Sequence, residues 1–445
     1  MAMQGLGRRF GLATALAISL AMGGAMGASP VLAAPKPVLP TAAPQSVGVS
    51  PERLKSLDAL MKSLVAEGHL PGASTMLIRH GKVVSFETYG VQAYDGPPVT
   101  KDTIFRIYSQ TKPVTGVAMM ILFEEGKWRL DDPVTKYIPE FANLRVYKGV
   151  NADGSFVTEP ADRPPTMREI MSHTAGFAYG LNPDNPVDKA YVSTGVLGSK
   201  SGQEFVEKVA KLPLYGPPGK QWKYSVGVDI QGFIIEKLSG QSLPDFMRER
   251  IFEPLKMQDT GFSLPPEKFY RLADLYMWSG KDKKIVPAEG FMVLDITKPP
   301  VVASGGGGLV STSTDYARFA QMLLNGGALD GVRILSPATV KLMASDHLPD
   351  AILDDPKAGF SKATGKGFGL DFMVITDPAR AGTLAGKGTY SWGGAAGTWF
   401  WIDPANDLIF LGMIHVLAKD GDPALRNLDE RTATLVYQAL TNPEK

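Results

Sequence analysis

Residues 108–113 read Tyr-Ser-Gln-Thr-Lys-Pro, and they join two different sequence patterns. The residues just before them, Phe-Arg-Ile at 105–107, are typical of a strand. From residue 114 to residue 122, apolar side chains recur at helical spacing. The stretch therefore predicts a change from strand to helix. Ser109 is expected at the helix N-terminus and Pro113 in the first turn, where a missing N–H costs little.

Lys112 follows Ser109 by three residues, so the two side chains are expected on one face of the predicted helix. A serine hydroxyl becomes a strong nucleophile when a base removes its proton, and a lysine that burial keeps neutral can act as that base. No other serine in the sequence has a lysine three residues later. The structural alternative is that serine is a common N-cap and lysine is common on helices. The spacing alone leaves both interpretations open.

Two later segments contain further candidates for the same site. Tyr224, in Lys-Tyr-Ser-Val at 223–226, follows a turn rich in proline and glycine and precedes a helical pattern. Residues 391–397 read Ser-Trp-Gly-Gly-Ala-Ala-Gly, and small residues in a strand permit close approach by a ligand. Each segment alone is equally compatible with a core tyrosine or a flexible turn.

Taken in this order, the motifs resemble those of the serine β-lactamase and penicillin-binding protein superfamily. The resemblance is closest to its class C-like members, especially the family VIII carboxylesterases. The resemblance extends over nearly all of the chain after residue 34, because it includes the segments LDDPVTKYIPEF, IMSHTAGF, GGGLVSTSTDYARF and WFWIDP. In that superfamily the S-x-x-K serine is the nucleophile, its lysine is the activator, the Y-x-N tyrosine shares the proton transfer, and a K-T-G strand lines the site.

The resemblance implies a role for each matching residue of this sequence. Ser109 is then the nucleophile, and Lys112 and Tyr224 move the proton. Backbone N–H groups of Ser109 and Ala395 are expected to form an oxyanion hole. The positions that correspond to the substrate-binding parts of the two later motifs are Val226, Trp392, Gly393 and Gly394.

Two departures from the superfamily pattern affect the expected substrate. Val226 replaces an asparagine that would contact an amide, and Trp392 replaces a lysine that would help to bind a carboxylate. Both changes favour acyl or aryl groups over β-lactams and peptide C-termini. The expected function is a serine hydrolase that cleaves short-chain carboxylic esters through an acyl-enzyme on Ser109. Its alternatives are a β-lactamase, a D-amino-acid peptidase or amide hydrolase, a transacylase, and a non-catalytic binding protein on the same fold.

Strand patterns occur near both ends of the chain. Two strands are expected around His80-Gly81-Lys82, and two more around a turn at residues 403–407, with a helix beginning at Ser50-Pro51. We therefore predict an α+β fold in which an antiparallel sheet, built from both chain ends and flanked by helices, carries an inserted, mostly helical region. The α/β part is expected at 35–113 and 300–445, and the helical part at 114–299.

Residues 1–34 have the pattern of an export signal. Arg8 and Arg9 form a basic start, an apolar run extends from residue 10 to residue 26, and Val-Leu-Ala at 31–33 resembles a cleavage site. The run lacks the sustained bulk of a membrane-spanning helix. We therefore expect a periplasmic or secreted protein with no stable membrane anchor after the signal is removed.

The composition limits the possible partners and cofactors. A formal net charge of +1 gives no excess of positive charge that would indicate binding to nucleic acid. The sequence has no cysteine and no HExxH pair among its five histidines, so we predict neither a metal nor another cofactor. His173, which precedes a glycine turn, is expected to brace a loop. The expected partner is a small-molecule ester or amide.

Overall fold

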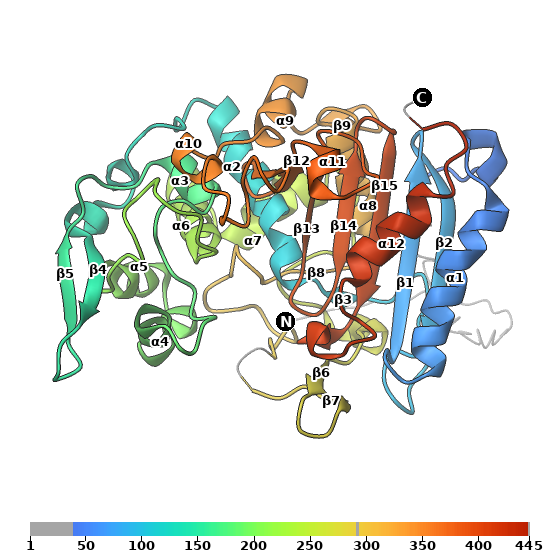
Figure 1. The fold of residues 1–445 in the computed structure, drawn as a ribbon, viewed down its shortest axis with the longest axis horizontal. Coiled ribbons are helices and arrows are strands. Elements are labelled where there is room, and N and C mark those ends of the chain that lie inside the picture. The colour runs from blue at the N-terminus through green and yellow to red at the C-terminus, as the bar shows by residue number, and fades with distance from the viewer. Residues whose placement is uncertain (1–38, 291–292, 444–445) are drawn as a thin grey trace, which may run out of the picture. The chain divides into compact units, whose positions relative to one another are not determined.

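The computed structural model describes residues 39–290 and 293–443, so the predicted export signal at 1–34 lies outside the described residues. A seven-stranded antiparallel sheet forms the centre of the described chain, in the order β11-β12-β13-β14-β15-β1-β2 (Figure 1). Its strands are β1 (Gly72–Arg79), β2 (Lys82–Gly90), β11 (Lys366–Phe368), β12 (Met373–Ile375), β13 (Tyr390–Gly393), β14 (Trp399–Asp403) and β15 (Leu408–Ile414).

The two ends of the chain meet inside this sheet, because β1 pairs with β15 from Ala73 opposite Ile414 to Arg79 opposite Leu408. The predicted α+β fold with a sheet built from both chain ends is therefore confirmed. The hairpins predicted around His80 and around residues 403–407 are β1–β2 and β14–β15. Their turns lie side by side, since His80 Nδ1 is 2.9 Å from Asp407 Oδ2.

Alternate residues of the central strands face opposite sides of the sheet, as strand geometry requires. Ala73 and Leu77 of β1 pack with α1 and α12, whereas Met76 and Ile78 of the same strand pack with α2 and α8. Ser50 caps α1 as predicted, because its side chain accepts a hydrogen bond from the Arg53 N–H. These four helices are α1 (Pro51–Ala66), α2 (Lys112–Glu124), α8 (Ser313–Leu324) and α12 (Leu428–Tyr437).

The region between residues 114 and 299 contains helices, as predicted, together with two hairpins that the sequence did not indicate. One hairpin, β4–β5, consists mostly of exposed or half-buried residues, so it has no apolar alternation to reveal it. The other, β6–β7, is completed by β16 from the distant end of the chain. The helices of this region after α2 are α3 (Met167–Met171), α4 (Pro186–Ser193), α5 (Gly202–Lys211), α6 (Gly227–Ser239) and α7 (Leu243–Met247). The strands of the two hairpins are β4 (Arg145–Val150), β5 (Phe156–Pro160), β6 (Tyr276–Ser279) and β7 (Lys284–Pro287), and the added strand is β16 (Val416–Leu417).

A short strand pair leads into the Ser109 segment. β3 (Phe105–Arg106) pairs with β8 (Val310–Ser311), and the Ile107 N–H then donates to the Leu309 carbonyl at 3.1 Å. Between β8 and β13 the chain adds β9 (Ala328–Leu329), β10 (Val332–Arg333), α9 (Pro337–Met343), α10 (Asp350–Leu353) and α11 (Pro378–Ala381).

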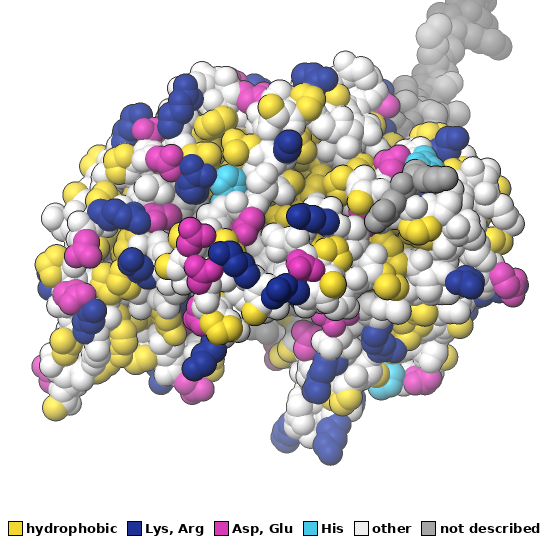
Figure 2. All heavy atoms as spheres, turned by 45° about the horizontal axis from the view of Figure 1, so that its top comes forward, with side chains coloured by type: hydrophobic (Ala, Val, Ile, Leu, Met, Phe, Trp, Pro, Cys, Tyr) yellow, Lys and Arg dark blue, Asp and Glu magenta, His cyan; other side chains and the backbone are white. Residues whose placement is uncertain are grey.

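Within the described ranges, no helix combines the length and the apolar character needed to cross a lipid bilayer. Figure 2 shows basic and acidic side chains interspersed on the face that it presents, rather than gathered by sign. Mixed charges of this kind produce no large single-sign potential on that face.

His415, between β15 and β16, gives an expected pH dependence of stability. Its side chain is buried near the rings of Phe105 and Tyr276, and neither ring nitrogen has a hydrogen-bond partner among the described residues. Burial, assisted by the Arg106 charge, lowers the pKa of His415 to about 3. Between pH 6.5 and about 3, the unfolded chain therefore binds a proton that the folded chain does not, and acid favours unfolding.

We expect His415→Phe to reduce this loss of stability. From pH 7 to pH 5 the wild-type protein should lose about 2 kcal/mol more free energy of unfolding than the variant does. Urea unfolding of both proteins at the two pH values measures the difference. Equal losses in the two proteins would show that His415 is protonated as easily in the folded state as in the unfolded state.

Candidate active site

Ser109 lies in a single 3₁₀ turn, Tyr108–Thr111, directly before α2. Tyr108 has a φ of 41°, a left-handed conformation that is uncommon for a residue other than glycine. This turn redirects the chain from β3 into α2 and exposes Ser109 to a cleft. Ser109 is thus at the start of a helical segment, as predicted, although its own turn is 3₁₀ rather than α.

Lys112 is in hydrogen-bond contact with Ser109. Its Nζ lies 3.2 Å from Ser109 Oγ and donates at 2.6 Å to the Gly306 carbonyl. The lysine is almost fully buried, at 1% exposure, and its Nζ lies 4.6 Å from the ring centroid of Tyr224 and 5.1 Å from that of Tyr179. A buried amine beside a cleft hydroxyl has the geometry needed to exchange a proton with it.

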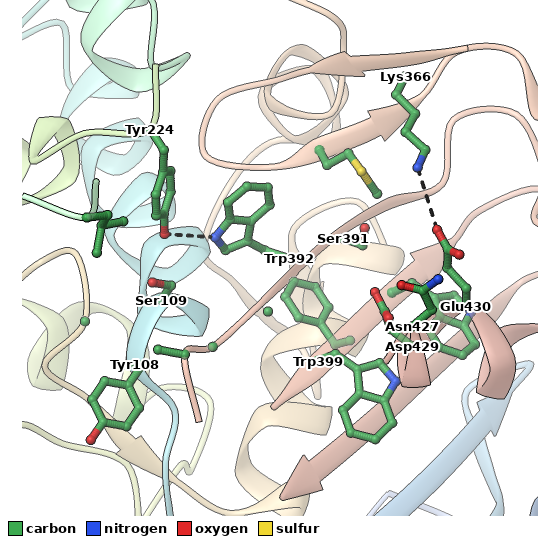
Figure 3. A pocket seen from close by; sticks show the side chains of 18 of the residues that line it. Tyr108, Ser109, Tyr224, Lys366, Ser391, Trp392, Trp399, Asn427, Asp429 and Glu430 are labelled. Carbon is green, nitrogen blue, oxygen red and sulfur yellow. Dashed lines mark hydrogen bonds and ion pairs between the residues drawn. The ribbon is translucent and has the colours of Figure 1, made fainter. Parts of the chain in front are cut away.

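Tyr224 and Trp392 form an aromatic wall beside this pair. The Trp392 indole N–H donates to the Tyr224 hydroxyl at 3.4 Å, and the Tyr224 ring stacks on Tyr179 with centroids 5.4 Å apart. Figure 3 shows Ser109, Tyr224 and Trp392 together at one end of the cleft. Lys112 contacts both Ser109 and the Tyr224 ring, so the structure brings the three predicted catalytic residues together.

His173 supports the Tyr224 segment from behind. Its carbonyl accepts a hydrogen bond from the Lys223 N–H at 2.8 Å, and its Nδ1 lies 3.1 Å from Ser225 Oγ. Burial, together with the charge of Lys112, lowers the pKa of His173 well below its usual value. The imidazole is therefore neutral and braces the loop, in agreement with the expectation from the sequence.

The glycines after Trp392 bring β13 against the Ser109 segment. A Cβ at Gly394 would lie 2.3 Å from the carbonyl oxygen of Ile107, so a larger residue cannot fit without moving the backbone. The sequence suggested approach by a ligand, whereas here the chain's own backbone makes the close approach. Gly393, Gly394 and Ala395 all line the cleft with Ser109.

The two backbone N–H groups predicted to form an oxyanion hole are those of Ser109 and Ala395. Among the described residues, neither donates to another backbone or side-chain group of the chain. Both residues belong to the cleft wall, as an oxyanion hole requires. Their role in stabilising an oxyanion stays a prediction.

The structure places the Val226 side chain elsewhere than predicted. Its side chain is fully buried in the hydrophobic core, and the residue is not part of the cleft wall. Its N–H donates to the Ala178 carbonyl at 3.0 Å, which holds the start of α6 against the segment after α3. The expectation that Val226 contacts the substrate is therefore corrected: the residue packs in the core two positions after Tyr224.

The cleft is much larger than this cluster, with a volume of about 1460 Å³. One rim carries three large aliphatic side chains that remain about half exposed: Leu181, Val192 and Leu197. The other end lies at α12, where Lys366 Nζ is 4.0 Å from Glu430 Oε1 (Figure 3). Within residues 39–290 and 293–443, no group of three possible ligand side chains is arranged to hold a metal ion.

The structure adds two residues that the sequence did not single out. Tyr179 stacks on Tyr224 and lies over Lys112, but no motif marks its position. Asp229 is buried in the first turn of α6 and contacts the glycine-rich segment that holds Lys112. An acidic residue inside the largely apolar α6 sequence is the signal that could have identified it.

A family model described as Beta-lactamase matches residues 57–434 of the chain. Protein Rv1367c of Mycobacterium tuberculosis (strain ATCC 25618 / H37Rv) is 36% identical over 389 residues, which cover 84% of this chain and 95% of the relative. Esterase EstB of Burkholderia gladioli is 30% identical over 372 residues, covering 80% and 88% of the two chains.

A solved structure has the same fold. EstCE1, described as a hydrolase with promiscuous acyltransferase activity, superposes with a TM-score of 0.71 at 25% identity. The superposition covers 88% of this chain and 99% of EstCE1. The match extends through both the sheet and the helical region, so the two parts occur together in the similar protein.

Proposed function

The chain belongs to the Beta-lactamase family and is a serine hydrolase, and from this premise we propose that it cleaves carboxylic esters, short-chain esters included, through an acyl-enzyme on Ser109. One observation carries the proposal: a cleft serine, Ser109, is in hydrogen-bond contact with the buried amine of Lys112. The names of the similar proteins EstB and EstCE1, an esterase and a hydrolase, support the same reaction class.

The proposed reaction has two steps. Ser109 Oγ attacks the ester carbonyl carbon while neutral Lys112 accepts the hydroxyl proton across their 3.2 Å contact. The C–O bond to the alcohol then breaks, and the alcohol leaves with a proton delivered by Tyr224 or Lys112. Water attacks the acyl carbon in the second step, releases the carboxylic acid and returns the proton to Ser109.

Two features of the cleft support an apolar acyl or aryl group on the substrate. Trp392 presents an indole ring beside Ser109 where the superfamily pattern has an ammonium group, so it provides no cation for a carboxylate. The half-exposed side chains of Leu181, Val192 and Leu197 add further apolar surface to the same cleft. The export signal predicted at residues 1–34 supports a periplasmic or secreted site of action.

The proposal is tested by comparing kcat/KM for p-nitrophenyl butyrate with kcat/KM for a chromogenic cephalosporin. We expect a preference for the ester of about 100-fold or more, because losing a charged contact to the substrate carboxylate costs about 3 kcal/mol. A preference for the cephalosporin would instead identify a β-lactamase. Adding methanol and measuring methyl butyrate distinguishes the transacylase alternative from hydrolysis.

A further inference from the structure

We propose that Asp229 is a positioning residue for Lys112: it anchors the loop Ser304–Gly308 so that the Gly306 carbonyl holds the lysine against Ser109. This inference rests on the proposed function, because it assigns Lys112 the task of exchanging a proton with Ser109. It also explains the run of four glycines at 305–308, which carries no phosphate-binding motif.

Three hydrogen bonds connect Asp229 to Lys112 through the loop. Asp229 Oδ1 accepts from the Ser304 hydroxyl at 2.5 Å and from the Gly306 N–H at 3.1 Å. The carbonyl oxygen of Gly306 then accepts from Lys112 Nζ at 2.6 Å. The same residue, Gly306, is therefore held by Asp229 through its N–H and holds Lys112 through its carbonyl.

The loop is also enclosed on both sides, which leaves it little freedom once Asp229 is in place. Thr115 of α2 donates to the Gly305 carbonyl at 2.7 Å. A Cβ at Gly305 would lie 2.6 Å from the Val228 carbonyl, and a Cβ at Gly306 would lie 2.6 Å from Asp229 Oδ2. Glycine is needed at both positions because the backbone passes directly between α2 and α6.

The charges around Lys112 make Asp229 the relevant carboxylate. Asp371, on the segment after β11, and His173, on the loop after α3, also face the lysine. Burial raises the pKa of Asp371 well above its usual value, which favours its uncharged form, and lowers that of His173 well below its usual value, so the imidazole stays uncharged near neutral pH. The rings of Tyr179 and Tyr224 also lie close to the Lys112 amine.

Burial also raises the pKa of Asp229, whereas the charge of Lys112 and the hydrogen bonds from Ser304 and Gly306 oppose that rise. An ionised Asp229 favours the ammonium form of Lys112, because opposite charges attract in a poorly solvated site. Removing the Asp229 charge therefore favours the neutral amine form of Lys112. A lysine that acts as a base when neutral would then remain active at lower pH.

The test uses two substitutions at this position. Asp229→Ala removes the anchor, and we expect kcat for p-nitrophenyl butyrate to fall by about 10- to 100-fold with KM little changed, since small displacements of a catalytic group cost this much. Asp229→Asn keeps an acceptor oxygen for Gly306. It should recover most of the kcat and shift the acidic limb of the kcat/KM profile to lower pH.

Asp315→Asn is the matched control. Asp315 is also a buried acid in the first turn of a helix, α8, where its Oδ2 accepts from the Asp259 N–H at 2.7 Å and from the Thr260 hydroxyl at 2.9 Å. Losing this charge should lower stability without shifting the pH profile. A wild-type pH profile in Asp229→Asn would overturn the proposal, as would a kcat within about threefold of wild type in a folded Asp229→Ala.

The labelling rate of Ser109 by a fluorophosphonate separates this inference from the proposed function. The probe reports the activated serine and requires no ester turnover. If the wild-type protein is labelled but does not hydrolyse the ester, the proposed substrate is wrong, and the Asp229 variants are compared by labelling rate over the same pH range. An unshifted labelling profile in Asp229→Asn would then overturn the positioning role by itself.

Discussion

Replacing Ser109 with alanine is expected to lower kcat for p-nitrophenyl butyrate by about 10⁶-fold, to the background of the assay, as loss of the nucleophile does in other serine hydrolases. The hydroxyl lies in the cleft at 3.2 Å from Lys112 Nζ, and the proposed acyl-enzyme forms on its oxygen. The substitution removes one half-buried oxygen atom, so the fold should be retained. Steady-state kinetics and a thermal melt of the same preparation measure the two properties.

A serine outside the cleft provides the control. Ser336 caps α9 with its side chain and does not belong to the cleft wall, so Ser336→Ala should change stability slightly and leave kcat unchanged. Mass spectrometry after fluorophosphonate treatment should locate the label on Ser109 in the wild-type protein. Ester hydrolysis in Ser109→Ala at the wild-type rate would remove Ser109 from the mechanism and leave the Ser109–Lys112 contact as a structural one.

Replacing Lys112 with alanine is expected to lower kcat by about 10²- to 10⁴-fold, the range that general-base assistance contributes. Lys112→Met is the better-matched variant, because it fills most of the same buried volume without a basic nitrogen. Both variants leave the Gly306 carbonyl without the Nζ donor, which costs stability as well. A thermal melt must therefore accompany the kinetics.

Lys127 is a suitable comparison for these variants. It follows α2, and its Nζ donates to the Leu238 carbonyl at 3.1 Å, so it is also a lysine bonded to a backbone oxygen. Lys127→Met should leave kcat near that of the wild-type protein. If folded Lys112→Met retained a near-normal kcat, another group would have to accept the Ser109 proton.

The parts of the fold that follow from local pattern were predictable from the sequence. The β1–β2 hairpin has a His-Gly turn between apolar runs, and α1 begins with Ser50 as a cap and Pro51 in its first turn. Ser109 and Lys112 are three residues apart, so helix geometry alone brings them together. Tyr224 and Trp392 required the superfamily pattern, since no spacing relates them to Ser109.

What the sequence could not indicate depends on contacts between distant segments. β6 is completed in parallel by β16, which comes from the far end of the chain. The core position of Val226 and the contact between Asp229 and Gly306 depend on how α6 packs against α2 and the glycine loop. Such contacts have no local signature, because each residue's own neighbours in sequence are compatible with several environments.

The pairing of β1 with β15 has a consequence for how the protein is made. Ala73 pairs with Ile414, and at a synthesis rate of about 5–20 residues per second the ribosome produces these two residues roughly 20–70 seconds apart. Ser109 is synthesised early in this interval and Ala395 close to its end. A nascent chain therefore carries the serine without the strand that completes the cleft, so the site cannot assemble until translation is almost finished.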